Sequence, residues 1–292
     1  MDSPIRGFVF ADRLRWRDFS VATRSAVIAL AFIYTLALLA PIIAPFDPTQ
    51  QLDIVALKSQ PPTFAHPFGT DRYSRDVLSR VLFGARVSIT VATLAVLVSA
   101  IVGSLYGLIA ASGGALVDSL MMRVIDAMLS IPRVLLLIAV LALWSPVPLV
   151  SLMLLLGFTG WYDVARLVRA EALSVREREF VAAAQSLGAS RVRVMLRHLL
   201  PNVLSPVIVT TTLGIGNVIV LEAGLSYIGV GVREPLASLG TMFQEGTEVF
   251  AGTWWTAVFP GTAIVVIVLC VNIMGDALRA SLDPRQLPVT HG

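Results

Sequence analysis

Long runs without a charged residue dominate this chain. The five longest cover residues 25–46, 87–117, 134–162, 199–221 and 249–275. A helix needs about 20 apolar residues to cross the hydrocarbon core of a bilayer. Charged residues make up 14% of the chain, compared with roughly 25% in soluble domains. The sequence therefore predicts an all-α, polytopic membrane protein.

The runs predict about six transmembrane helices. The run 134–162 is interrupted by Ser145, Pro146 and Pro148, so it is divided between two spans. The expected spans are 24–46, 87–112, 120–144, 147–168, 203–230 and 254–276. Together they form one transmembrane domain over residues 24–292, preceded by an N-terminal segment, 1–23. The lone Cys270 lies in the last span, which excludes an intrachain disulfide.

Basic residues set the expected orientation. With six spans, both termini lie on the same side as residues 170–200, and that side holds most of the arginines. The opposite side holds Lys58, Arg72, Arg75, Arg80, Arg86 and Arg233. The positive-inside rule then predicts cytoplasmic segments 1–23, 170–200 and 277–292, and outer segments 47–86 and 231–253. Because the basic residues flank membrane spans, the net charge of +3 does not indicate nucleic-acid binding.

Motifs for catalysis by this chain are absent from the sequence. Its only lysine, Lys58, follows Leu57, so no Gly-Lys-[Ser/Thr] phosphate loop exists. The three histidines are far apart, and neither a His-Glu-x-x-His pair nor a Gly-x-Ser-x-Gly turn occurs. We therefore expect no enzyme, no metal and no cofactor in this chain, and no ATP hydrolysis by a phosphate loop of its own.

Residues 170–200, called the island below, form a charged amphipathic stretch between two apolar spans. Ser174 to Glu177 has the pattern of a capping box, which predicts a helix that starts there and runs to about Leu187. Gly188 suits the left-handed position that ends helices. Ser190 can cap a second helix through about Leu200, and Pro201 can begin the next span.

The first predicted helix of the island carries an apolar stripe. Phe180, Ala183, Ala184 and Leu187 are spaced i, i+3, i+4 and i+7, so they share one helix face. Such a stripe fits the groove of another protein. It equally fits packing against the cytoplasmic helix ends of this chain, and the periodicity alone favours neither alternative.

Other charged residues outside the island also suggest sites. Residues 68–86 are predicted to form an amphipathic helix at the outer interface. Its residues Asp71, Arg72, Arg75 and Asp76 would dock a partner protein or form a structural collar. Arg133 and Glu222, charged residues within spans, would line a path or a partner interface. Arg123 and Asp126, near the start of the third span, are expected to pair.

The island resembles the EAA loop of permease subunits of bacterial ABC importers, whose pattern is Glu-Ala-Ala-x3-Gly-x9-Ile-x-Leu-Pro. Ala183, Ala184, Gly188, Leu200 and Pro201 match it, whereas Ala182 and His198 replace its Glu and Ile. Further blocks resemble the DppC/OppC-type (dipeptide, oligopeptide and nickel) permeases in the same order along the chain. They are residues 66–88, 121–132, 221–232 and 275–285.

The resemblance implies a type I ABC importer permease fold in the bacterial inner membrane. The partners it implies are a second, usually different permease subunit, two cytoplasmic ATPases that bind ATP and Mg, and an extracytoplasmic binding protein. The island would couple to an ATPase through Glu179, Phe180, Ala183, Ala184, Leu187, Gly188, Ala189 and Ser190. Peptides are the leading substrate class, with nickel chelates and other small solutes left open. A stand-alone secondary transporter or channel, or a membrane scaffold, is the alternative.

Overall fold

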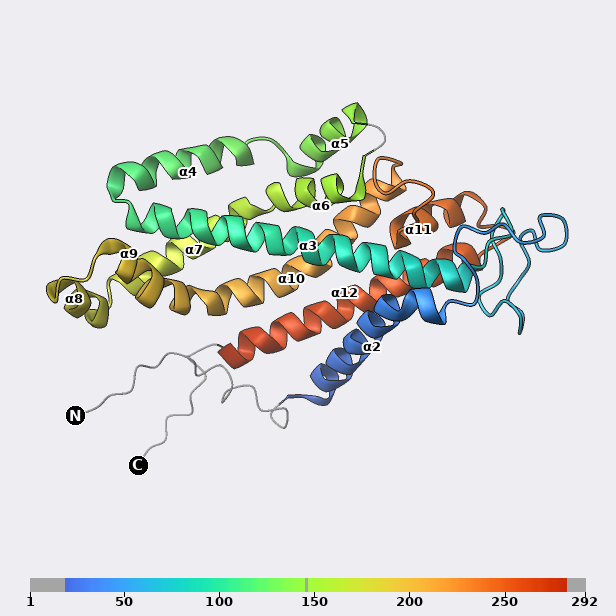
Figure 1. Ribbon diagram of the computed structural model, residues 1–292, viewed down its shortest axis with the longest axis horizontal. Coiled ribbons are helices and arrows are strands. Elements are labelled where there is room, and N and C mark those ends of the chain that lie inside the picture. Colours follow the sequence, from blue (N-terminus) through green and yellow to red (C-terminus); the bar gives the residue numbers. More distant parts are fainter. Residues whose placement is uncertain (1–18, 145–146, 283–292) are drawn as a thin grey trace.

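The computed structural model describes residues 19–144 and 147–282, and within these residues it contains helices and no strand (Figure 1). The helices are α2 (Val21–Ile43), α3 (Val77–Ser112), α4 (Ala115–Leu129), α5 (Arg133–Leu143), α6 (Leu149–Phe158), α7 (Trp161–Arg176), α8 (Glu179–Ser186), α9 (Arg191–Val194), α10 (Leu200–Tyr227), α11 (Leu239–Glu248) and α12 (Trp255–Leu282). A π-helical turn, Met195–Leu199, joins α9 to α10.

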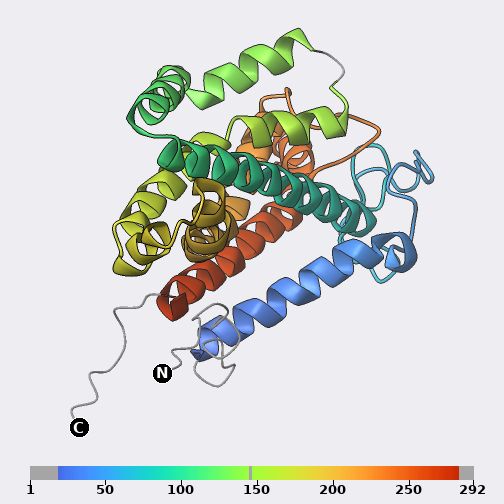
Figure 2. The ribbon, with the colours of Figure 1, turned by 60° about the vertical axis from the view of Figure 1, so that its left-hand side comes forward.

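Helix α3 runs through the middle of the bundle. It packs against α6 and α7 on one side and against α10 and α2 on the other, while α12 packs against α10, α11 and α2 (Figure 1). Helices α4 and α5 lie at the edge of the bundle, away from α10 and α12 (Figure 2). The island, with α8 and α9, and the outer loop before α3 lie at opposite ends of the molecule.

Four helices in the described chain are long and apolar enough to cross a membrane: α2, α3, the continuous helix Arg191–Tyr227 and α12. Helices α4 and α5 supply a fifth crossing if the pair, which is bent by 70°, counts as one span. The expected span 120–144 is thus broken, and Pro132 is the N-cap of α5. The expected span 147–168 is also divided, into α6 and α7, by Thr159 and Gly160.

The start of α3 corrects the expected interfacial helix. Residues 68–76 are irregular, and residues 77–86 are the first turns of α3, which continues without a break to Ser112. Asp76 is the N-cap, and its Oδ2 accepts a hydrogen bond of 2.8 Å from the Ser79 amide. A side-chain cap satisfies a backbone donor that the first turn leaves unpaired, which is why the helix begins here.

Close approach of α3 to α7 depends on two glycines one turn apart. A Cβ atom on Gly107 would lie 2.5 Å from the carbonyl oxygen of Ala165, and one on Gly103 would lie 2.7 Å from that of Trp161. Membrane helices associate through packing of this kind, because lipid provides no hydrophobic drive between them. The small-residue pair visible in the sequence therefore has a structural role.

Two departures from expectation occur in the island. Ser174 and Glu177 do not begin a helix: Ser174 lies in the last turns of α7, and α8 starts at Glu179. No break separates the second helix from the next span either, since Arg191–Tyr227 is one helix. Pro201 has no N–H to donate to the carbonyl of Arg197, and the π-helical turn just before it absorbs this defect.

The buried apolar side chains form two clusters. The larger one joins α2, α3, α5, α6, α10, α11 and α12. The smaller one lies at the island end, where Val181 of α8 and Val194 of α9 pack with side chains of α3, α7 and α10. This second cluster attaches the island to the bundle.

Candidate functional site

Helix α8 presents its apolar stripe outward. Leu187 is 89% exposed and Phe180 is 43% exposed, while Ala183 is exposed and Ala184 is half-buried. Leu187 and Ala183 therefore do not pack on this chain's own helix ends, which was one of the two alternatives, whereas the Phe180 ring lies 6.0 Å from that of His198. Val181, on another face, is fully buried. Burying a valine side chain outside the membrane contributes about 1.5–3 kcal/mol, so α8 is anchored by one face and leaves the Leu187 end of the stripe exposed.

The C-terminal end of α8 is closed by backbone geometry that the sequence predicts. Gly188 has φ +83°, a conformation that costs other residues about 1–2 kcal/mol. Its N–H donates to the carbonyl of Gln185 at 2.9 Å, and the N–H of Ala189 donates to that of Ala184 at 3.1 Å. These two bonds form a Schellman motif. The Ser190 Oγ then accepts from the Arg193 amide at 3.3 Å and caps α9.

Glu179 occupies the first position of α8 and is exposed. A carboxylate there interacts favourably with the positive end of the helix dipole. The eight expected coupling residues thus lie together, in one short helix and the turn that follows it.

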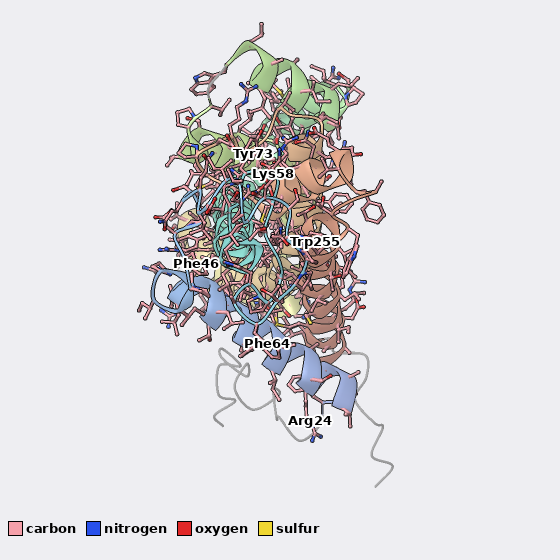
Figure 3. The ribbon with its side chains drawn as sticks, turned by 90° about the vertical axis from the view of Figure 1, so that its right-hand side faces the viewer. Arg24, Phe46, Lys58, Phe64, Tyr73 and Trp255 are labelled. Carbon is pink, nitrogen blue, oxygen red and sulfur yellow. The ribbon has the colours of Figure 1, made fainter. Side chains whose placement is uncertain are left out.

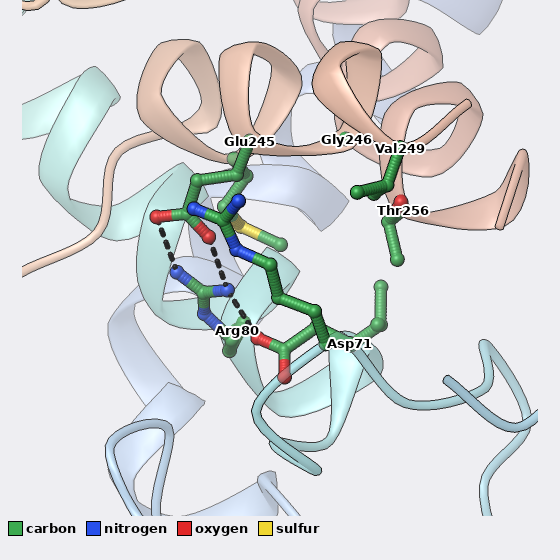
Figure 4. A pocket seen from close by; sticks show the side chains of 9 residues that line it. Asp71, Arg80, Glu245, Gly246, Val249 and Thr256 are labelled. Atoms are coloured by element: carbon green, nitrogen blue, oxygen red, sulfur yellow. Dashed lines mark hydrogen bonds and ion pairs between the residues drawn. The ribbon is translucent and has the colours of Figure 1, made fainter. Parts of the chain in front are cut away.

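At the end of the bundle opposite the island, an ion-pair network joins residues far apart in the sequence. Asp71 Oδ2 accepts from Arg75 Nε and from Arg80 Nη1, each at 2.6 Å. Arg80 Nη1 also donates to Glu245 Oε2 at 2.8 Å (Figure 4). Arg75 reaches Glu234 Oε1 at 2.7 Å and Glu245 Oε2 at 3.0 Å. The network ties the start of α3 to α11 and to the loop before it.

The four residues expected to dock a partner differ in exposure. Asp71, Arg75 and Asp76 are buried. The Asp76 Oδ1 atom lies 2.9 Å from Nδ1 of His66, within hydrogen-bonding distance. Burial would lower the pKa of Arg75, but the charge of Asp71 and the hydrogen bond to Glu234 outweigh it and raise that pKa above its ordinary value. These three side chains are therefore engaged within the chain itself rather than exposed to a partner.

Arg72, the fourth, forms a more exposed ion pair, with Glu248 at 2.9 Å. Around it the outer loop offers further exposed side chains, among them Lys58, Phe64 and Tyr73 (Figure 3). The exposed polar and aromatic surface at this end is therefore this loop, together with the Arg72–Glu248 pair.

The two charged residues expected to line a path bond within the chain instead. Glu222 is fully buried, and its carboxylate accepts from Ser88 at 3.0 Å and from Ser226 at 2.7 Å. Arg133, half-buried at the start of α5, donates to the carbonyl of Leu156 at 2.9 Å and to Thr159 Oγ1 at 3.2 Å. Arg133 thus braces the break between α6 and α7, and Glu222 is not offered to a path in this conformation.

The expected pair of Arg123 with Asp126 is wrong. Asp126 pairs with Arg166 of α7, and Asp118 pairs with Arg169 of the same helix. Arg123 itself is exposed. Both ion pairs fasten α4 to α7, an association that local spacing along α4 does not reveal.

Sequence reasoning also missed several residues that hold the sites together. Val181 lies outside the predicted stripe and was not singled out, yet it packs in the second buried cluster. An apolar residue directly after Phe180, on a different helix face, is a sequence signal for such an anchoring face. Glu234 and Glu245 gave no signal, because their arginine partners lie 159 to 170 positions earlier in the chain.

A helical membrane bundle with an anchored, outward-facing apolar helix at one end has the organisation of a subunit that works with a soluble partner. Residues 103–287 match the family model described as the inner membrane component of binding-protein-dependent transport systems. This chain belongs to that family. It is accordingly a multi-pass inner-membrane permease subunit of an ABC importer, and the family works with substrate-binding proteins and with ATPases.

Curated relatives cover nearly the whole chain. A putative peptide transport system permease protein of Brucella abortus is 40% identical over 272 residues, which is 93% of this chain and 89% of that protein. The dipeptide transport system permease protein DppC of Haemophilus influenzae is 38% identical over 270 residues, with 90% and 91% covered. DppC of Bacillus subtilis is 35% identical over 257 residues, with 88% and 79% covered.

Proposed function

We propose that α8 is the coupling helix of this permease. Its apolar stripe would sit in a cleft of an ATPase subunit, so that ATP-driven movement of that subunit displaces α8. The observation that carries the proposal is the 89% exposure of Leu187 on a helix whose other face is anchored by Val181. A leucine this exposed at the end of a fixed helix is suited to insertion into a partner's groove.

The connection from α8 to the membrane supports transmission of such a movement. The Schellman motif at Gly188 and the cap at Ser190 fix the angle between α8 and the next helix. That helix, Arg191–Tyr227, has 37 residues and is therefore about 55 Å long. A displacement of α8 would thus be carried along one continuous element to the outer half of the bundle.

Ala182 occupies the position of the motif glutamate, so this chain lacks the usual carboxylate there. Glu179 is three residues earlier, about one helical turn away, and is exposed. We assign Glu179 the role of pairing with a basic side chain of the ATPase.

The remaining subunits are proposed to surround the bundle. Helices α4 and α5 expose Leu116, Leu135 and Leu143, and this face is suited to a second, homologous permease, with the translocation path between the two chains. Both termini and the island would be cytoplasmic. The outer loop and the Arg72–Glu248 pair would receive the binding protein.

The proposed cargo is a peptide. Relatives at 35–40% identity over most of the chain are named for peptide or dipeptide transport. The binding protein would deliver the peptide, and two ATPase subunits, each with ATP and Mg, would drive its import.

The test of the coupling helix is Leu187→Arg. A charge in place of this exposed leucine does not disturb the bundle, so the chain should still insert into the membrane. We expect it to lose its ATPase subunits on purification and to lose peptide uptake by at least tenfold. The matched control is Ser186→Arg, which adds the same charge to the same helix outside the stripe. Normal uptake by the Leu187→Arg protein would contradict the assignment.

A stand-alone transporter would behave differently in the same preparation. It would move solute in liposomes without ATP, and neither arginine variant would affect it. Retention of a second permease and of ATPases by the unmodified chain would instead agree with the importer.

A further inference from the structure

An open hollow lies at the island end of the bundle, between the island and the last turns of α3 and α7. Four polar side chains contribute to its wall: Ser112 of α3, Arg176 of α7, Gln185 of α8 and Arg191 of α9. Its apolar part comes from Val194 and Leu199, which are 4% and 1% exposed. Figure 1 places these helix ends together, although the chain visits them in widely separated segments.

The charge of this hollow is positive. Arg176 and Arg191 both line it, and none of the described residues that line it is a carboxylate. Arg176 is held in place, since its Nη1 donates to the carbonyl of Ala111 at 2.8 Å. For Arg191 the structure gives neither an ion pair nor a side-chain hydrogen bond to any described residue. Two guanidinium groups without a counter-charge favour an anion between them.

The other polar groups are also suited to an anion. The Ser112 Oγ is buried and has no hydrogen-bond partner in the described part of the chain. A buried hydroxyl without a partner costs free energy, so a ligand oxygen at this position would relieve an existing defect. Gln185 can offer amide donors beside it.

We propose that this hollow binds a phosphate group. Two guanidinium forks, a hydroxyl and an amide form the donor set that a tetrahedral, multiply charged oxyanion requires. The phosphate can belong to an anionic lipid headgroup, because α3 and the helix Arg191–Tyr227, both membrane spans, end here. It can equally belong to a soluble phosphate, and the two sources are separated below.

A phosphate in this hollow would join two parts of the molecule. Gln185 and Arg191 belong to the island, whereas Ser112 and Arg176 belong to the ends of α3 and α7. A bound phosphate therefore stabilises the island against the bundle. Its effect on coupling rests on the proposed function of α8, but its binding does not, so the experiment measures binding directly.

The experiment uses the full-length chain, with the subunits that remain bound to it, in neutral detergent. Native mass spectrometry follows titration with two probes, inorganic phosphate and dioleoyl-phosphatidylglycerol, and dioleoyl-phosphatidylcholine serves as the reference lipid. The test variant is Arg191→Gln, because this side chain makes no ion pair or side-chain hydrogen bond to any described residue whose loss would disturb the fold. The matched control is Arg193→Gln, on the same short helix but outside the hollow.

We expect a saturable site whose affinity falls about tenfold or more in Arg191→Gln, the effect of losing a charge-assisted hydrogen bond. Arg193→Gln should retain the affinity of the unmodified chain. Saturation by inorganic phosphate identifies a soluble ligand, and saturation by phosphatidylglycerol alone identifies a headgroup. The proposal is overturned if neither probe saturates the site. It is also overturned if both variants weaken binding equally, because binding would then depend on the overall surface charge and not on the hollow.

Discussion

At the scale of single residues, Glu222 is a buried carboxylate enclosed among hydroxyl groups. Ser88 and Ser226 each donate to it, and each serine accepts in turn from a backbone amide, that of Leu239 at 3.2 Å and that of Val232 at 3.2 Å. Hydrogen bonds thus run from two backbone amides through two serines to one carboxylate. The arrangement connects α3, α10 and the residues around the start of α11.

Glu222→Ala should destabilise the chain. The substitution removes the acceptor of two buried hydroxyl groups and leaves a void, and an unsatisfied buried polar group costs about 1–3 kcal/mol. We expect a lower midpoint of thermal unfolding in detergent than for the unmodified chain. The control is Glu171→Ala, at an exposed position of α7, which should leave the midpoint unchanged. Equal midpoints for the two variants would refute the structural role of Glu222.

At the scale of elements, the outer ion-pair network holds α11 against the start of α3. Arg80 is its most buried arginine: it contacts both Asp71 and Glu245 and is only 3% exposed. A buried ion pair adds little net stability over apolar packing, but loss of one partner leaves the other charge buried and unpaired. The network therefore constrains where α11 can lie.

Arg80→Met should loosen α11. Methionine keeps much of the side-chain length but removes one of the two arginines that contact Glu245, which retains Arg75. Loss of hydrogen bonds to a charged group costs about 1.5–3 kcal/mol. We expect faster amide hydrogen exchange over residues 239–248. Arg72→Met is the matched control: its pair with Glu248 is more exposed, and exposed pairs contribute about 0–1 kcal/mol. If amide hydrogen exchange in α11 is equally slow in both variants, Arg80 does not stabilise the position of α11.

At the scale of the whole molecule, the two ends of the bundle carry different surfaces. The island end has the exposed stripe of α8 and several arginines, while the other end has the outer loop and the ion-pair network. The charge asymmetry predicts that the island faces the cytoplasm. The coupling proposal requires the same orientation, because ATP is cytoplasmic.

Cysteine labelling tests this orientation. Native Cys270 is buried, so it gives little background. Phe64→Cys, in the outer loop, and Ser186→Cys, on α8, both place a thiol at an exposed position. In intact spheroplasts a membrane-impermeant maleimide should label only the Phe64→Cys protein, and in opened membranes it should label both. Labelling of only Ser186→Cys in intact spheroplasts would reverse the assignment.

Local features of the sequence predicted local structure well. The left-handed turn at Gly188 and the cap at Ser190 depend on residues a few positions apart, and both were confirmed. The capping box at 174–177 failed because α7 had not yet ended. A helix already propagating overrides a start signal, since each added residue gains a hydrogen bond without a new nucleus.

The sequence by itself determined that the chain crosses a membrane, because its long uncharged runs carry more apolar surface than a water-soluble fold can bury. It also determined which island residues share a helix face. Only the tertiary structure decided that the stripe on α8 faces outward, that Asp71 and Arg75 are buried, and that Glu222 is enclosed. The reason is physical. Helical periodicity specifies which side chains share a face, but which face is buried depends on elements that pack from distant parts of the chain. Ion pairs across 159 or more positions have no local signal.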